Sequence, residues 1–335
     1  MANTGRNAVA DASPKAPSLE PGARSPRKKD FLSILDFDHA ELDGLLSLAV
    51  RMKAERALGA KAPTATSLSS LHVALLFEKP SLRTRSTFEV AIRELGADTL
   101  HLPAHFAEGV REPLEDVARN LERWVRALVI RTYGQEKAQR LATAGKQLTV
   151  VNALTDDQHP CQALADVMTM REQWGTTEGR TVAYVGDGNN VATSLMQAAV
   201  MMGVNVRLAS PAEYALSDAV VQKAAGRARG GARIERFADP LAAVKGADAV
   251  YTDVWASMGE EHEADHRRDV FAPYQVNATL MAAASPHAIF MHCLPAHRGE
   301  EVTSEVIESP ASIVFDQAEN RLHTQKALLH LLLAS

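Results

Sequence analysis

Three positive charges fall within seven residues of the stretch KPSLRTRSTF: Lys79, Arg83 and Arg85. They lie where a helical pattern begins, although the start of a helix carries free N–H groups and partial positive charge that disfavour cations. A bound anion would remove this conflict, and phosphate suits both guanidinium and backbone N–H groups. The alternative is a solvated basic turn paired with acidic neighbours such as Glu78 and Glu89. The stretch is not a P-loop, because it lacks the glycines and the Gly-Lys-Ser/Thr ending.

Other polar residues occur where strands end or helices begin. In the stretch HPCQALAD, His159 and Gln162 are three residues apart. One face of a helix start can therefore offer both side chains as hydrogen-bond partners for a carbonyl and an amide. Arg131 ends an expected buried strand, where an arginine requires an anionic or carbonyl partner. The alternative is a capping histidine and a surface glutamine.

Asp253 and Cys293 follow two further expected strands, in the stretches TDVWASMGEE and MHCLPAHRGEE. A carboxylate at a strand end can hold a cationic amine, or simply form an Asx turn. A buried cysteine most often acts as a small apolar group. His292 and His297 lie nearby, but a fourth ligand with zinc-site spacing is absent from the sequence pattern, so we expect no metal.

The stretch YVGDGNN is similar to the start of a dinucleotide-binding fold. It lacks the third glycine of that fingerprint, and Ala209-Ser210 occupy the place of the acidic ribose ligand. We therefore expect no nicotinamide cofactor. Asn189 and Asn190 can instead cap the following helix or hold a polar substrate.

Short apolar runs alternate with helical patterns from Phe31 onward. The alternation predicts an α/β protein in which parallel sheets carry helices on both faces. A helix over 160–174 would join two such units, with a ligand cleft between the carboxyl ends of their strands. We expect N-caps at Asp38 and Ser81. The expected strands are 72–77, 98–102, 125–131, 147–154, 181–185, 204–209, 248–252 and 288–292, and further helices run from Ser81 through Leu95 and over 114–124 and 317–333.

The composition limits the class of protein. The 335 residues carry a formal net charge of −5, with a sequence pI near 6.2, which argues against a nucleic-acid or membrane-surface binder. No apolar run reaches the roughly 18–20 residues of a membrane span. Two cysteines do not suggest a disulfide framework, so we expect a cytoplasmic protein. Residues 1–30 are rich in proline, alanine and serine without a signal-peptide pattern, and we expect a disordered extension.

Taken in order, SLRTR, HPCQALAD, GDGNN, DVWASMG, HCLPAHRGEE and AENR resemble the motifs of the transcarbamoylase family over roughly residues 32–335. The resemblance implies two doubly wound parallel-sheet domains joined by an interdomain helix. Residues 31–158 would bind carbamoyl phosphate and be completed by the C-terminal helix, 317–335. Residues 159–316 would bind ornithine and include the linking helix, 159–174. The pair DVWASMG and HCLP indicates ornithine, rather than aspartate, as the acceptor.

The resemblance also implies a site. The implied carbamoyl-phosphate ligands are Ser81, Leu82, Arg83, Thr84, Arg131, His159, Gln162, Cys293, Leu294 and Arg321. The implied ornithine ligands are Asn190, Asp253, Ser257 and Met258. The implied catalytic residues are Arg131, His159, Asp253 and Cys293. The ornithine amine would attack the carbamoyl carbon and expel phosphate, giving citrulline in arginine metabolism, with no metal, no organic cofactor and no covalent cysteine intermediate. Cys293 would orient the acceptor and can assist in removing the proton.

The chain departs from the family pattern in two places. Leu82 replaces a commoner threonine. The stretch HFAEGVREP (105–113) lacks the glutamine that the family often donates to a neighbouring subunit, although a homotrimer remains the expectation. Two alternatives stay open: a carbamoyltransferase for acyl-ornithine or putrescine, and a non-catalytic homologue that binds carbamoyl phosphate.

Overall fold

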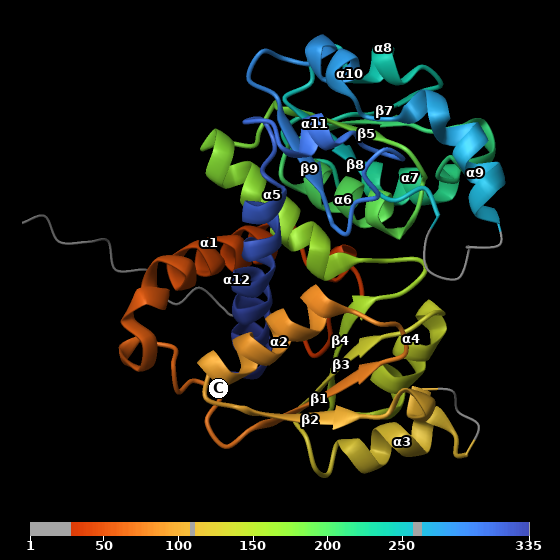
Figure 1. The fold of residues 1–335 in the computed structure, drawn as a ribbon. Coiled ribbons are helices and arrows are strands. Elements are labelled where there is room, and N and C mark those ends of the chain that lie inside the picture. The colour runs from red at the N-terminus through yellow and green to blue at the C-terminus, as the bar shows by residue number, and fades with distance from the viewer. Residues whose placement is uncertain (1–27, 108–110, 257–262, 335) are drawn as a thin grey trace, which may run out of the picture.

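The chain folds around two parallel sheets, which Figure 1 shows one above the other. The structure is a computed structural model that describes residues 28–107, 111–256 and 263–334. The four-stranded sheet has the order β2-β1-β3-β4, and the five-stranded sheet has the order β7-β6-β5-β8-β9. Residues 1–27 of the expected extension lie outside the described residues. Among the residues described, no helix has the length and apolar character needed to cross a membrane.

The first sheet and its helices come from the first half of the chain. Its strands are β1 (His72–Phe77), β2 (Asp98–Leu102), β3 (Ala127–Arg131) and β4 (Thr149–Leu154). Its helices are α1 (His39–Glu55), α2 (Leu82–Glu94), α3 (Leu114–Leu121) and α4 (Gln135–Ala144).

The second sheet and most of its helices follow α5 (Pro160–Trp174). Its strands are β5 (Thr181–Val185), β6 (Asn205–Ala209), β7 (Ile234–Phe237), β8 (Ala249–Thr252) and β9 (Ile289–His292). Its helices are α6 (Asn190–Met201), α7 (Asp218–Ala225), α8 (Pro240–Val244), α9 (Ala264–Phe271), α10 (Ala278–Ala283) and α11 (Ser304–Ile307). The chain ends with α12 (Val314–Leu333).

Both faces of each sheet are covered. Along β1, Val73 and Leu75 belong to one core, whereas Ala74 and Leu76 belong to another. Successive side chains of a strand point to opposite faces, so this division places apolar cores on both sides. The residues of β5 divide between two cores in the same way. The two sheets are therefore doubly wound, which confirms the expected fold class.

The two long helices α5 and α12 lie between the sheets in Figure 1. Eleven consecutive residues of α5, 160–170, are buried, so this helix has no solvent-facing stripe over its first three turns. The last turns of α12 share a core with α1 and β1, through Leu328 and Leu329 packed in the cluster of Leu45 and Val73. The C-terminal helix thus returns to the core of the first sheet.

Most expected elements are present, with shifted ends. The strands expected from 125 and 147 each begin two residues later, and the helix expected to reach Trp124 ends at Leu121. The strand β7 was not expected, because its sequence IERF is half charged and it lies at an edge of the sheet. The helix expected from 317 begins at Val314.

The two expected N-caps differ. The Asp38 side chain accepts a hydrogen bond from the Glu41 N–H (2.9 Å) and the Glu41 carboxylate accepts one from the Asp38 N–H (2.8 Å), which forms a capping box. Ser81 occupies the N-cap position of α2, but its side chain makes no capping hydrogen bond. The free N–H groups of this helix start therefore lack their expected partner.

Candidate functional site

A pocket of about 700 Å³ opens between the two sheets. It lies beyond the carboxyl ends of β1, β3 and β4 on one side and of β5, β8 and β9 on the other, as the parallel strands require. The sequence-predicted residues that line it are Ser81, Leu82, Arg83, Thr84, Arg131, His159, Asn190, Asp253, Cys293, Leu294 and Arg321. Ser257 and Met258 lie outside the described residues.

The three cations of the opening stretch have different surroundings. Lys79 Nζ pairs with Asp156 Oδ1 at 2.6 Å and lies 4.3 Å from the centre of the Tyr133 ring. Arg85 is paired with Glu89 at 3.0 Å, as the solvated-turn alternative requires. Within the described parts of the chain, Arg83 forms no ion pair. The charge conflict at this helix start therefore remains at Arg83, which lines the pocket.

Arg321 reaches the same end of the pocket from the middle of α12. It was expected near a helix start but lies two turns inside the helix, because the helix begins at Val314. Its Nη2 donates to Thr84 Oγ1 and its Nη1 donates to Gln162 Oε1, both at 2.8 Å. The guanidinium is buried and is fixed on two sides.

Gln162 does not line the pocket, contrary to the expectation that it points into the cleft with His159. Its amide oxygen accepts from Arg321, and its amide nitrogen donates to Asp166 Oδ1 at 2.9 Å. Both ends of the amide are thus engaged behind the pocket wall. Gln162 therefore contacts Arg321 and Asp166 instead of the pocket.

The guanidinium groups of Arg83, Arg131 and Arg321 create a concentration of positive charge. Burial, followed by the nearby charge of Arg321, lowers the pKa of Arg131 to about 10. Burial also lowers the pKa values of Arg83 and Arg321. All three remain cationic near neutral pH, and an anion between them would relieve their mutual repulsion.

Unsatisfied buried nitrogens accompany this charge. Arg131 Nε, Arg321 Nε and His159 Nδ1 are buried and have no hydrogen-bond partner among the residues that the structure describes. Leaving a buried donor unpaired is costly, on the order of 1–3 kcal/mol each. Guanidinium N–H groups can only donate, so the missing partner must be an acceptor. The arrangement favours an anionic, oxygen-rich ligand at this end of the pocket.

His159 is neutral at this site. Burial and the charges of Arg321 and Arg131 hold the pKa of its imidazole well below the ordinary value. The His159 N–H at the start of α5 donates to Ser194 Oγ at 2.8 Å, which fixes the residue against α6. A neutral imidazole offers one donor and one acceptor, and adds no further positive charge to the arginine cluster.

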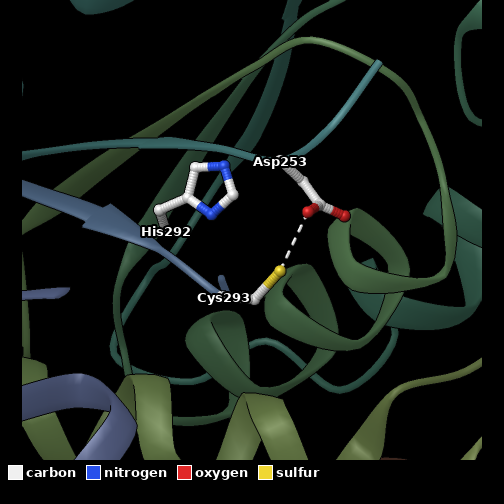
Figure 2. Close-up of side chains that lie close together, drawn as sticks. All are labelled: Asp253, His292 and Cys293. Carbon is white, nitrogen blue, oxygen red and sulfur yellow. Dashed lines mark hydrogen bonds between the residues drawn. The ribbon is translucent and has the colours of Figure 1, made fainter. Parts of the chain in front are cut away.

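The part of the pocket lining that follows β8 and β9 carries a buried carboxylate, Asp253. Figure 2 shows the Cys293 thiol directed at the Asp253 carboxylate, and Sγ donates to Oδ1 at 2.9 Å. Burial, followed by the charge of Asp253, raises the pKa of Cys293 well above its ordinary value. The thiol is therefore protonated near neutral pH and acts as a donor. A carboxylate held in this way can receive an ammonium group.

Asn189 holds the other oxygen of Asp253. Its Nδ2 donates to Asp253 Oδ2 at 2.9 Å, while its Oδ1 accepts from the Val191 N–H at 2.9 Å at the start of α6. The expectation that Asn189 caps this helix is confirmed, but its bond to Asp253 was not foreseen. Asn190 donates to the Thr155 carbonyl oxygen, which links the start of α6 to the loop after β4.

Asp253, His292 and Cys293 also form a group that could hold a metal ion, because their ligand atoms lie within 4.8 Å of one another. However, His292 Nδ1 accepts from the Leu294 N–H at 2.9 Å and its Nε2 lies 3.2 Å from Glu301 Oε1. Both imidazole nitrogens are engaged, so the site offers no free imidazole ligand. The residues do not fit a resident metal at this position.

Two ion pairs at the pocket were not predicted from the sequence. Lys79–Asp156 is one of them, and Asp187–Arg267 is the other, at 3.0 Å between Oδ2 and Nη1. Arg267 also donates to the Trp255 carbonyl oxygen at 2.8 Å. Each pair joins segments distant in sequence, so local spacing carried no signal for it.

Comparisons with known proteins match both halves of the chain. The family model described as aspartate/ornithine carbamoyltransferase, carbamoyl-P binding domain, matches residues 29–172. The model described as aspartate/ornithine carbamoyltransferase, Asp/Orn binding domain, matches residues 178–332.

Individual relatives agree with these models. A protein of Thermosynechococcus vestitus named ornithine carbamoyltransferase is 49% identical over 308 residues, which cover 92% of this chain and 96% of the relative. A protein of the same name from Methanospirillum hungatei is also 49% identical over 308 residues, covering 92% and 100%. The solved structure of ornithine carbamoyltransferase from Pyrococcus furiosus is similar with a TM-score of 0.86 and 46% identity, covering 91% of this chain and 97% of that one.

Proposed function

The chain belongs to the aspartate/ornithine carbamoyltransferase family, and from this membership we propose the reaction that it catalyses. It transfers the carbamoyl group of carbamoyl phosphate to the side-chain amine of L-ornithine, giving L-citrulline and phosphate. The observation that carries this proposal is the charge of the pocket lining, which combines arginines from α2, β3 and α12 with the Asp253–Cys293 pair that follows β8 and β9. An anionic donor suits the arginines, and a cationic acceptor suits the carboxylate.

The donor phosphate lies at the start of α2 in this proposal. Arg83 and the N–H groups after Ser81 hold its oxygens, because the Ser81 side chain does not cap these N–H groups and Arg83 forms no ion pair with a residue that the structure describes. Arg131 and Arg321 supply the buried donors that face the phosphate and the carbamoyl oxygen. Gln162 acts through Arg321 rather than on the ligand directly. The remaining proposed donor ligands are Leu82, Thr84, His159, Cys293 and Leu294.

The acceptor lies beside Asp253 in this proposal. The Asp253 carboxylate takes the α-ammonium group of ornithine, oriented by Asn189 and Cys293. Asn190 is a further proposed ligand, and Ser257 and Met258 stay proposals from the motif DVWASMG.

The chemical step follows from these positions. The side-chain ammonium group, with a reference pKa of about 10.4, loses a proton to solvent, and the resulting amine attacks the carbamoyl carbon. A tetrahedral intermediate forms, and Arg131 and neutral His159 stabilise its oxygen. The C–O bond to phosphate then breaks, and the attacking nitrogen passes its extra proton to the departing phosphate. The raised pKa of Cys293 leaves it a thiol, so we assign it an orienting role and not that of a base.

We also propose which domain binds which substrate. Residues 31–158 together with α12 form the donor-binding domain, since α12 packs into the core of the first sheet. Residues 159–316 form the acceptor-binding domain, with α5 as the link. The enzyme would act in the cytoplasm as a homotrimer, and sedimentation equilibrium should give three times the chain mass of 36.2 kDa.

The decisive experiment measures citrulline formation from carbamoyl phosphate and ornithine, with acetylornithine, putrescine and aspartate as competing acceptors. Turnover confined to ornithine supports the proposal. Turnover with another amine but not with ornithine would support the proposed donor site and contradict the proposal that ornithine is the acceptor. Binding of carbamoyl phosphate without any turnover indicates a non-catalytic homologue.

Asp253→Asn tests the acceptor end separately. Losing a buried charge partner for the α-ammonium should raise KM for ornithine at least tenfold, because charged hydrogen bonds contribute about 1.5–3 kcal/mol. Asp265→Asn is the matched control, since Asp265 is exposed and pairs only with Arg268 among the contacts known for it. An unchanged KM in Asp253→Asn would remove Asp253 from the acceptor site.

A further inference from the structure

A continuous chain of buried hydrogen bonds runs behind the pocket from its donor end to its acceptor end. Its members lie on four elements: α2, α5, α12 and the end of β9. Each is at most 2% exposed. In order, they are Thr84, Arg321, Gln162, Asp166, Gln317 and the backbone N–H of His292, and we call them the Asp166 network.

The part of this network that runs from Thr84 through Arg321 and Gln162 to Asp166, which we call the donor arm after the proposed carbamoyl donor, fixes Arg321. The guanidinium donates to Gln162 Oε1, and the Gln162 amide nitrogen donates to Asp166 Oδ1 at 2.9 Å. Gln162 and Asp166 lie one turn apart on α5, so their side chains share one face of that helix. A guanidinium accepts nothing, which means that the Gln162 amide has only one satisfactory orientation.

The part of the network that runs from Asp166 through Gln317 to the His292 N–H, which we call the acceptor arm after the proposed carbamoyl acceptor, fixes the start of the HCLP segment. Gln317 Nε2 donates to Asp166 Oδ1 at 2.7 Å, and Gln317 Oε1 accepts from the His292 N–H at 3.0 Å. Cys293 is the next residue, and its thiol donates to Asp253. The Gln317 amide is therefore one hydrogen bond away from the backbone that carries the thiol.

Tyr251 completes the surroundings of Asp166. Its hydroxyl donates to Asp166 Oδ2 at 3.3 Å and accepts from Gln317 Nε2 at 3.1 Å. Three donors thus converge on one carboxyl group that has no direct contact with the pocket. The two glutamine amides are both oriented by Asp166 Oδ1, which accepts from Gln162 and from Gln317.

We propose that Asp166 is a positioning residue that couples the two ends of the pocket, holding Arg321 through Gln162 and the Cys293 segment through Gln317. This inference rests on the proposed carbamoyl transfer. A shift of Arg321 on donor binding would be transmitted to the segment that orients the acceptor. Asp166 itself touches neither substrate.

Two variants separate the arms. Gln317→Met keeps the volume and removes only the acceptor arm, so KM for ornithine should rise on the order of tenfold, the effect of about 1.4 kcal/mol. The dissociation constant for carbamoyl phosphate alone, measured by calorimetry, should change by less than about threefold in this variant. Asp166→Ala removes both arms, and both constants should rise.

Asp166→Asn is the rescue variant. Its Oδ1 can still accept from Gln162 and Gln317, so both constants should stay near those of the unmodified enzyme. Thr169→Val is the matched control, because Thr169 lies on the same helix, is equally buried, and accepts from Asn320 of α12 outside the network. It should lower stability without changing either constant.

The proposal is overturned if folded Gln317→Met retains its KM for ornithine, or if Thr169→Val raises KM as strongly. If Asp166→Ala does not fold, Gln317→Met and Asp166→Asn still decide. Failure of the proposed function has a different signature: the unmodified enzyme binds carbamoyl phosphate but forms no citrulline, and the donor arm is then tested by calorimetry alone.

Discussion

At the scale of residues, Asn189 shows how one side chain can serve structure and recognition together. Its amide oxygen satisfies two N–H groups at the start of α6, and its amide nitrogen holds Asp253. The cap fixes the amide, so the nitrogen is presented to the carboxylate without further loss of side-chain entropy. The position of Asp253 thus depends on the start of a neighbouring helix.

Asn189→Asp should separate the two functions. The new carboxylate can still cap α6 but repels Asp253, so KM for ornithine should rise by on the order of tenfold. Asn277→Ala is the control, because Asn277 caps α10 and contacts no pocket residue among its known bonds. It should lower the free energy of unfolding by about 1 kcal/mol and leave KM unchanged. Steady-state kinetics and urea unfolding measure both effects, and an unaltered KM in Asn189→Asp would contradict this role.

Asp166 should give stability a dependence on pH. Burial raises its pKa to about 7, despite the hydrogen bonds that it accepts. Between about pH 4 and 7 the unfolded chain therefore ionises this carboxyl while the folded protein keeps its proton, so stability falls as pH rises, by at most roughly 4 kcal/mol. Above pH 7 the effect is constant.

The comparison with Asp166→Asn isolates this contribution. As pH rises from about 4 to 7, the free energy of unfolding of the unmodified protein should fall relative to that of the variant. Urea unfolding at several pH values measures it. A difference that stays constant from pH 4 to 7 would show that Asp166 does not titrate there.

At the scale of elements, Lys29 links the beginning of the described chain to the end of α4. Its Nζ donates to the carbonyl oxygens of Ala142 (2.9 Å), Gly145 (3.0 Å) and Leu148 (2.9 Å). A cation at a helix C-terminus satisfies free carbonyl groups and complements the helix dipole. Lys29 was expected within the disordered extension, because a single lysine in a basic run does not reveal carbonyl partners 113 residues away.

Lys29→Met should lower the free energy of unfolding by about 1–2 kcal/mol, the effect of lost charged hydrogen bonds at a partly exposed helix end. Lys28→Met is the control. The Lys28 side chain is exposed, and its ion pair with Glu41 is long, at 4.0 Å between Nζ and Oε2. Urea unfolding of the two variants measures the contrast. The KM values should not change, and equal stability of the two variants would refute the anchoring role.

At the scale of the whole molecule, the donor site exists only where three distant segments meet. Arg83 comes from α2, Arg131 from the end of β3 and Arg321 from α12. Folding brings their charges together and buries Arg131 and Arg321, so the repulsion among the three groups lowers the stability of the fold. An anion that binds there should therefore stabilise the whole fold.

Inorganic phosphate is the probe for this effect. At about 100 times its dissociation constant it should raise the free energy of unfolding by about 2.7 kcal/mol, because it binds only the folded protein. Arg321→Met should abolish the effect, whereas Arg85→Met should preserve it, since Arg85 is paired with Glu89. Thermal unfolding with and without phosphate measures it, and equal stabilisation of both variants would contradict the arginine site.

The sequence alone determined the features that depend on neighbouring residues. Apolar runs marked eight strands, and Asp38 marked a helix start. Ordered motifs located ten of the residues that line the pocket, and the end of an expected strand located an eleventh, Arg131. Periodicity and capping involve residues within a few positions of each other, so the sequence displays them directly.

Only the tertiary structure decided how these residues are used. Gln162 binds Arg321, 159 positions away, instead of facing the pocket, and Asp166 meets Gln317 across 151 positions. The edge strand β7 and the early start of α12 likewise depend on the neighbours that cover them. The physical reason is that a buried polar group takes whichever partner folding places beside it, and that choice has no local pattern.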